Sequence, residues 1–274
     1  MDRIRKALDL AREERTRPAD PAIDEPRVME AKFARRVPAK IEYTKTRVFR
    51  ASAALLESNR IIDPGGASQA AAAFRMLRTQ VLQRMLERQW RSIAVLSPAS
   101  HDGKTTTAIN LAISLANDQR HTVLLVDFDL KQPAIADKLG IAPERGADDI
   151  LRGHASIEDC LYHPAGFDRL VVLPARNALE NSSEALAGPV CRELVTELRD
   201  RYPDRIVVFD LPPVMGADDA LAFVPLVECA LVVVCEGLTR REDLSRCMEL
   251  LRNTPVVGTV LNRATETVAA YGYE

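Results

Sequence analysis

The chain has 274 residues, 47% of them hydrophobic, and a formal net charge of −2. That length accommodates one large α/β domain or two smaller ones, and the near-neutral charge gives no overall electrostatic basis for nucleic-acid binding. Five cysteines without CxxC spacing argue against a disulfide framework and against a zinc site, and we interpret them as small buried core residues in a reducing cytosol.

The beginning of the chain differs in composition from the rest. Residues 1–60 hold 15 Lys and Arg against 10 Asp and Glu, whereas the remainder has 22 against 29. Residues 2–15 fit a short amphipathic helix that docks on a partner or an anionic membrane surface, or else a solvated tail. The prolines and mixed charges of residues 16–66 predict a flexible linker. The charged start argues against a signal peptide, and no window of about 18 apolar residues predicts a transmembrane helix, so we expect a cytoplasmic protein.

From residue 68 the sequence is typical of alternating helices and strands. Strong helix formers predict a helix over residues 68–88, on which Arg75 and Arg78 share a face. Nearly continuous apolar runs predict strands buried on both faces at 92–96, 122–126, 169–173, 206–210, 230–235 and 255–261. Helices are predicted at 104–118, 147–152, 156–161, 184–201, 218–227 and 241–252. Such repeated units predict an α/β fold with a doubly wound, mostly parallel sheet flanked by helices.

The stretch 97–110, SPASHDGKTTTAIN, joins a predicted strand to a predicted helix and contains Gly103-Lys104-Thr105. In this arrangement backbone N–H groups point at a phosphate and the lysine adds a positive charge. The phosphate-loop pattern is Gly-x4-Gly-Lys-[Ser/Thr], and Pro98 stands at its first glycine. The alternative interpretation is a Gly-Lys-Thr that only begins a helix.

Three aspartates favour the nucleotide interpretation. Asp127 and Asp210 each end a predicted strand, and Asp129 lies two residues beyond the first. Magnesium prefers hard oxygen ligands from a hydroxyl, one or two carboxylates, waters and nucleotide phosphates. The alternative interpretation, in which such aspartates only cap helices, is common for a single aspartate but explains three of them beside the loop poorly. Thr105 in the loop supplies the hydroxyl that a magnesium site needs.

The order GKTTTAINLAISLA, LLVDFDLKQP, IVVFDLPPV and VVGTVLNR resembles the bacterial tyrosine autokinases of capsular and exopolysaccharide synthesis, over about residues 68–274. That family has a P-loop NTPase fold, a Walker A motif, a DxD motif followed by a basic residue and Pro, a Walker B motif ending Asp-x-Pro-Pro, and a tyrosine-rich tail. Lys131 stands where Arg is usual, which keeps the charge but loses the planar fork. The resemblance implies an ATP-dependent protein-tyrosine autokinase that phosphorylates C-terminal tyrosines of a neighbouring subunit and regulates polysaccharide polymerisation and export.

The resemblance also implies roles for single residues, with ATP and Mg²⁺ as ligands. The implied ATP-binding residues are Asp102, Gly103, Lys104, Thr105, Thr106, Asn262 and Arg263. Lys104 would hold the β- and γ-phosphates. Thr105, Asp129 and Asp210 would organise the metal, and Asp127 would accept the proton of the tyrosine hydroxyl, since phosphoryl transfer depends on positioning and charge neutralisation.

The tail and the helix before the loop carry the remaining implications. Tyr271 and Tyr273 would be the phosphoacceptors. Arg75 and Arg78 match two positions of the family's Glu-x2-Arg-x2-Arg oligomer motif, whereas the Glu position is Ala72.

The implied partners are a membrane chain-length-determinant (polysaccharide co-polymerase) protein, other copies of the chain and a cognate tyrosine phosphatase, without nucleic acid. The chain would lie at the inner face of the plasma membrane through that partner. We expect an N-terminal extension over 1–66, a P-loop kinase domain over 67–264 and a mobile tyrosine-containing tail over 265–274.

Two other functions are compatible with the motifs. A partition- or division-site-type ATPase would share the fold, but such proteins carry an extra lysine early in the loop, where this chain has Pro98 and Ala99, and they lack a tyrosine tail. A nucleotide-binding scaffold with weak turnover is suggested by Pro98, by Ala72 and by the short tail.

Overall fold

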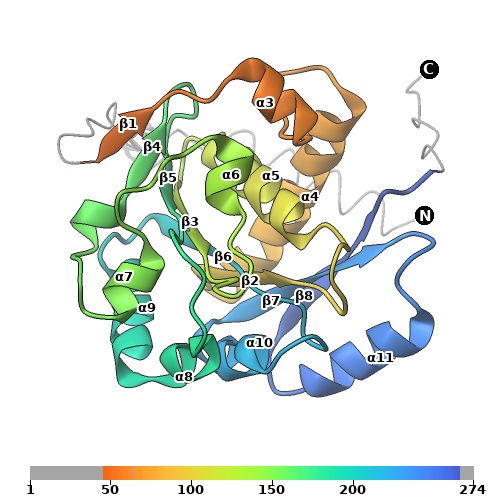
Figure 1. Cartoon of the computed structure of the whole chain (residues 1–274). Helices are drawn as coiled ribbons and strands as arrows, with labels where there is room; N and C mark the ends of the chain where they lie inside the picture. The colour runs from red at the N-terminus through yellow and green to blue at the C-terminus, as the bar shows by residue number, and fades with distance from the viewer. Residues whose placement is uncertain (1–45, 64, 266–274) are drawn as a thin grey trace, which may run out of the picture. The chain divides into compact units, whose positions relative to one another are not determined.

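A computed structural model describes residues 46–63 and 65–265 of the chain. Its centre is an eight-stranded sheet in the order β1-β4-β5-β3-β6-β2-β7-β8 (Figure 1). The strands are β1 (Arg47–Phe49), β2 (Ser92–Leu96), β3 (Thr122–Asp127), β4 (Tyr162–Pro164), β5 (Leu170–Leu173), β6 (Arg205–Asp210), β7 (Cys229–Cys235) and β8 (Val256–Asn262). Neighbouring strands run parallel except β4 and β5, which confirms the mostly parallel sheet.

Helices cover both faces of this sheet. They are α3 (Ala53–Ser58), α4 (Gln69–Glu87), α5 (Lys104–Ala116), α6 (Ile135–Leu139), α7 (Ala147–Leu151), α8 (Ser182–Ala187), α9 (Pro189–Asp200), α10 (Asp219–Phe223) and α11 (Arg241–Leu250), with 3₁₀ turns η1 (Glu158–Cys160) and η2 (Val224–Leu226). Helices α4, α5 and α6 share one core with the sheet, and α7 to α11 share the other.

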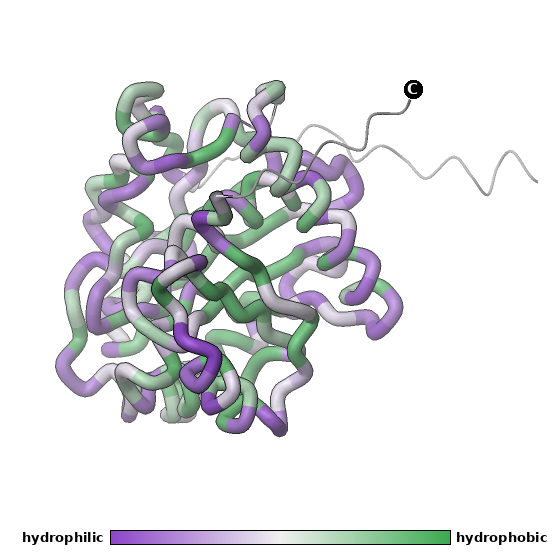
Figure 2. The backbone as a smooth tube through the Cα atoms, turned by 90° about the vertical axis from the view of Figure 1, so that its right-hand side faces the viewer, coloured by the Kyte–Doolittle hydropathy of each residue, from purple (hydrophilic) through white to green (hydrophobic). Residues whose placement is uncertain are grey.

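Strand side chains alternate between these two cores because successive residues of a strand point to opposite faces. In β3, Val123 and Leu125 pack toward α5, whereas Leu124 and Val126 pack toward α9 and α10. Figure 2 shows the strands as hydrophobic segments running through the middle of the molecule, with hydrophilic loops outside. The five cysteines are all buried and unpaired, as expected.

Helix α5 is almost completely enclosed, because it is apolar on every side. Its two central polar side chains find partners in neighbouring segments. Asn110 accepts a hydrogen bond from the Ile62 N–H (2.9 Å) and donates to the Arg60 carbonyl (2.9 Å), and the Ser114 hydroxyl donates to the Phe74 carbonyl (3.0 Å). These bonds fix the helix that comes directly after the phosphate loop.

The folded region begins earlier than the sequence predicts. Residues 47–62 belong to the expected linker, yet β1 pairs in parallel with β4, and Ile61 and Ile62 are buried against α5. Strand β1 and helix α3 are too short to show a period in the sequence, so only their long-range contacts reveal them. The expected helix 2–15 and the tyrosines Tyr271 and Tyr273 lie outside the described residues.

Prolines explain two further differences. The predicted helix 184–201 is interrupted at Gly188, and α9 begins with Pro189, since a proline in a helix interior would remove a hydrogen bond. Pro225 likewise shortens the predicted helix 218–227, which in the structure is helix α10 followed by the 3₁₀ turn η2. No helix within the described ranges has both the length and the apolar character that crossing a bilayer requires.

Candidate nucleotide-binding and phosphoryl-transfer site

The predicted phosphate loop joins β2 to α5 at the carboxyl end of the sheet, where ligands of such folds bind. Gly103, the residue before α5, has φ +92°, a backbone conformation that residues with a Cβ atom rarely adopt. A Cβ atom there would lie 2.0 Å from Nδ2 of Asn262. The glycine is therefore required both by its backbone and by a neighbour from the end of β8.

Lys104, the first residue of α5, points to the acidic cluster. Its Nζ lies 2.6 Å from Oδ2 of Asp129 and 3.4 Å from Oγ1 of Thr105. Burial lowers the lysine pKa, but the negative charges of Asp210 and Asp129 outweigh it, so the pKa is raised above its ordinary value. Lys104 consequently keeps its positive charge at the mouth of the loop, where a phosphate would need it.

Asp127 and Asp210 lie side by side on the central strands β3 and β6. They are register partners, both are fully buried, and the Phe128 N–H donates to the Asp210 carbonyl (2.9 Å). One carboxylate oxygen of Asp127 accepts hydrogen bonds from the N–H groups of Ala134 and Ile135, at the start of α6. The two aspartates that end predicted strands thus lie side by side, although Asp127 also caps a helix.

The two buried carboxyl groups are electrostatically unusual. Burial raises the pKa of Asp127 well above its ordinary value, and the nearby charge of Asp210 raises it further. Burial also raises the pKa of Asp210 to about 6, against the opposing effects of the Lys104 charge and the Thr105 hydroxyl. Both shifts express the cost of placing negative charge in a low-dielectric interior without a partner for each oxygen.

Three buried carboxylate oxygens at this site, one of Asp127 and both of Asp210, have no hydrogen-bond partner by geometry among the described residues. Hard oxygens of this kind beside the Thr105 hydroxyl fit a Mg²⁺ ion that also uses nucleotide phosphates. Over the described ranges no group of three or more His, Cys, Asp or Glu side chains forms a ready-made metal centre.

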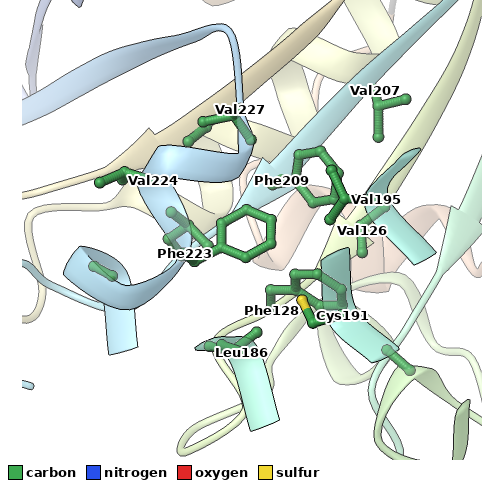
Figure 3. Packing of buried hydrophobic residues seen from close by; sticks show 14 of the residues in the cluster. Val126, Phe128, Leu186, Cys191, Val195, Val207, Phe209, Phe223, Val224 and Val227 are labelled. Atoms are coloured by element: carbon green, nitrogen blue, oxygen red, sulfur yellow. The ribbon is translucent and has the colours of Figure 1, made fainter. Parts of the chain in front are cut away.

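An aromatic cluster supports the aspartates from the opposite face of the sheet. Phe128, Phe209 and Phe223 have ring centroids 5.0 to 5.5 Å apart and are completely buried (Figure 3). Because strand side chains alternate, Phe209 points away from the face that holds Asp210. Phe128 lies directly between Asp127 and Asp129 in the chain. The cluster therefore packs residues that are direct chain neighbours of all three aspartates.

The remaining predicted nucleotide residues lie at or near the loop. Asn262, at the end of β8, donates from Nδ2 to the Asp102 carbonyl (2.8 Å) and accepts at Oδ1 from the Arg263 N–H (2.9 Å). Arg263 is exposed, and Thr106 is half-buried in the first turn of α5. The Asp102 side chain is completely buried and accepts a hydrogen bond from Oγ1 of Thr239 (2.7 Å).

Sequence reasoning missed Thr239, because it lies 137 residues from Asp102 and belongs to no motif. It also missed the contact of Lys131, whose Nζ lies 2.7 Å from Oδ2 of Asp219 on α10. Asp219 is fully buried and its other oxygen accepts from the Ser182 hydroxyl. The basic residue of the DxD motif therefore anchors its loop to α10.

The predicted oligomer arginines make contacts within the chain. Arg75 donates to the Gly66 carbonyl (3.1 Å), and Arg78 donates to the Ser114 carbonyl (3.3 Å) on α5. Neither guanidinium is simply solvated, which differs from the usual state of such a pair on a helix surface. Between them on α4, Met76 is 66% exposed.

The sequence matches the family model described as the CobQ/CobB/MinD/ParA nucleotide binding domain over residues 93–270. It is 28% identical to the tyrosine-protein kinase YwqD of Bacillus subtilis over 203 residues, which cover 73% of this chain and 84% of that protein. It is 32% identical to the succinoglycan biosynthesis transport protein ExoP of Rhizobium meliloti over 215 residues. That match covers 75% of this chain but only 26% of ExoP.

Solved structures agree with these sequence matches. The VpsO kinase domain aligns with a TM-score of 0.64 and 31% identity, over 70% of this chain and 94% of that domain. The septum site-determining protein MinD of Pyrococcus horikoshii, complexed with Mg-ADP, aligns with a TM-score of 0.55 and 26% identity, over 65% of this chain and 72% of that one. The named kinases are the more similar relatives, so the partition-type alternative is not better supported.

Proposed function

The chain belongs to the CobQ/CobB/MinD/ParA family of nucleotide-binding domains, and from that premise we propose that it transfers the γ-phosphoryl group of ATP to protein tyrosines in exopolysaccharide synthesis. One observation carries the proposal: buried carboxylate oxygens without partners among the described residues lie beside a Lys104–Asp129 ion pair at a phosphate loop. We propose tyrosine as the acceptor because relatives are named tyrosine-protein kinases. We propose exopolysaccharide synthesis as the process because ExoP is named a succinoglycan biosynthesis transport protein.

The proposed mechanism assigns each group a task that its surroundings support. Backbone N–H groups from Asp102 to Thr106 and the charged Lys104 bind the phosphates. Thr105, Asp129 and Asp210 would hold Mg²⁺, which when bound would neutralise charge on the β- and γ-phosphate oxygens.

Asp127 is the proposed general base. Burial and the nearby Asp210 charge raise its pKa, which makes its carboxylate a stronger proton acceptor than an ordinary aspartate. One of its oxygens is held by the N–H groups at the start of α6, and the other, which has no hydrogen-bond partner among the described residues, is the oxygen proposed to accept the proton.

The finer assignments concern the acceptor, the adenine and the partners. Tyr271 and Tyr273 are the acceptors, presented by a neighbouring subunit, and Asn262 and Arg263 lie along the adenine. Arg75 and Arg78 contribute to contacts between copies. A membrane chain-length-determinant protein recruits the chain to the inner face of the plasma membrane, and a cognate phosphatase reverses the labelling.

The decisive experiment is a phosphotyrosine assay on the purified full chain. With ATP and Mg²⁺ we expect labelling, mapped to Tyr271 or Tyr273 by mass spectrometry, that Lys104→Met abolishes. The double change of both tail tyrosines to Phe should remove the label, whereas Tyr202→Phe, at a tyrosine on the surface of the described domain, should keep it. Absence of phosphotyrosine, even with the cytoplasmic segment of the membrane partner added, would instead support the nucleotide-binding scaffold.

A further inference from the structure

We propose that the buried side chain of Asp102 is a positioning residue that holds the phosphate loop in its nucleotide-binding shape, and that Thr239 anchors it. The proposal rests on the proposed nucleotide site but not on the identity of the phosphoryl acceptor. It assigns a task to two residues, one of which belongs to no sequence motif.

Inside the loop, both backbone groups of Ala99 are bound by side chains. Its N–H donates to Oδ2 of Asp102 (3.1 Å), and its carbonyl accepts from the Ser97 hydroxyl (2.6 Å). The preceding residue is Pro98, which has no N–H to donate. The early part of the loop is therefore fixed by side chains, and phosphate binding falls to the later N–H groups of the loop, whose position the Asp102 carboxylate sets.

Outside the loop, the same carboxylate is tied to the turn after β7. Oδ1 of Asp102 accepts from the Thr239 hydroxyl (2.7 Å), and that hydroxyl oxygen accepts from the Cys235 N–H (2.7 Å). The threonine thus connects Cys235, the last residue of β7, to the loop. Thr239 is half-buried, whereas the Asp102 carboxylate is fully buried, so breaking the bond between them leaves a buried charged group short of one partner.

The backbone of Asp102 is held as well. Its carbonyl accepts from Nδ2 of Asn262, the same atom that closes against Gly103. One residue is therefore fastened through its side chain to the end of β7, by way of Thr239, and through its backbone to β8. No other phosphate-loop residue is tied in this way to both strands among those that the structure describes.

The positioning role of Asp102 can be distinguished from the effect of its negative charge. A carboxylate close to bound phosphates repels them, so its negative charge alone should weaken nucleotide binding. What the carboxylate offers is two acceptor oxygens, one for Ala99 and one for Thr239, whereas an asparagine has a single acceptor oxygen. We call the two hydrogen bonds that the Asp102 carboxylate accepts, from Ala99 and from Thr239, the brace. Changing Asp102 to Asn removes a repulsion of the phosphates, which should strengthen nucleotide binding, but it also breaks the brace, which should weaken binding.

The first test measures binding of a fluorescent ATP analogue with Mg²⁺ to the full chain. Thr239→Val, which removes the hydroxyl at nearly constant volume, should raise the Kd about tenfold, the usual effect of one lost hydrogen bond to a charged group. Thr239→Ser should stay within about twofold of wild type. The matched control is Thr196→Val, because Thr196 is exposed on α9 and its hydroxyl donates to a backbone carbonyl of its own helix; its Kd should not change.

The second test uses Asp102→Asn. Weaker binding than wild type supports the brace, and equal or tighter binding overturns it. The thermal unfolding midpoint and the fraction of active sites are measured for each variant. A loss of positioning should raise the KM for ATP in a fully folded sample, whereas general damage should lower only the fraction of active sites. If Asp102→Asn does not fold, the Thr239→Val and Thr239→Ser pair decides.

Failure of the proposed function has a different signature. If wild type binds no nucleotide, or if Lys104→Met binds as well as wild type, the nucleotide site itself is wrong. If wild type binds and Thr239→Val binds equally well, only the brace is wrong.

Discussion

At the scale of single residues, the most informative group is the Asp210 carboxyl. Its pKa is about 6 in the folded chain against an ordinary value of 3.8, because burial disfavours its charged form. A carboxyl whose pKa is raised by folding stabilises the fold when protonated. That stabilisation is complete below about pH 3.8 and is lost as the pH rises through about 6, so at neutral pH the ionised side chain costs stability.

The resulting prediction concerns Asp210→Asn, which imitates the protonated form. Without nucleotide and with EDTA present, we expect the variant to match wild type near pH 3.5 and to be more stable by about 2 to 3 kcal/mol at pH 7.5, from roughly 1.4 kcal/mol for each unit of pKa. Urea unfolding at a series of pH values measures the difference.

Asp118→Asn provides a control of opposite sign. The hydrogen bond from Arg120 lowers the pKa of Asp118 to about 2, so its contribution exists above pH 3.8 and disappears as the pH falls through about 2. This variant should be less stable than wild type at neutral pH. Stability curves for Asp210→Asn and wild type that stay parallel across the pH range would contradict the raised pKa.

At the scale of elements, the segment before the predicted domain is part of its core. Ile61 and Ile62 are buried, and both polar ends of the enclosed Asn110 side chain bond to residues 60–62. We predict that a chain starting at residue 67 is less stable than one starting at residue 46 by roughly 3 to 6 kcal/mol, from two buried isoleucines and an unsatisfied amide. Urea midpoints of the two truncations test this, and coincident midpoints would restore the boundary at residue 66.

The elements that can be predicted from the sequence are those with a local signal. The central strands are continuous apolar runs, and helix α5 comes after a loop that marks its beginning, so the predicted bounds lie within a residue or two of those in the structure. Strands β1 and β4 have three residues each and are defined only by their pairing. Pairing between segments so far apart in the chain leaves no periodic pattern in a single sequence, which is why these edge elements escape prediction.

The candidate site divides in the same way. The sequence singles out Asp127, Asp129 and Asp210 because they lie at or just after the ends of two predicted strands, and the structure places all three near Lys104. Thr239 cannot be predicted, because it belongs to no motif and contacts a residue 137 positions earlier in the chain. In the structure its hydroxyl is used to hold the phosphate loop.

At the scale of the whole molecule, the point where the tail begins bears on how the tyrosines meet an active site. Asn262 touches the phosphate loop of its own chain, and three residues later the Thr265 N–H (2.5 Å) and hydroxyl (3.0 Å) both donate to Glu236. The six residues from Thr265 to Tyr271 span at most about 20 Å when extended. A reach of that length from an anchor three residues beyond Asn262 does not by itself exclude the chain's own site, whereas the family resemblance implies transfer to a neighbouring subunit's tail.

We therefore predict complementation between two defective chains. A Lys104→Met chain keeps the tail but lacks the lysine that holds the phosphates, and a chain ending at Thr265 keeps the site but lacks both tail tyrosines. Mixed with ATP and Mg²⁺, they should yield phosphotyrosine on the Lys104→Met chain, with a rate that rises with the concentration of the truncated chain. Mass spectrometry of the C-terminal peptide measures the label. The Lys104→Met chain mixed with a truncated chain that also carries Lys104→Met should remain unlabelled. Labelling of wild type that is independent of dilution, together with an unlabelled mixture, would show transfer within one chain.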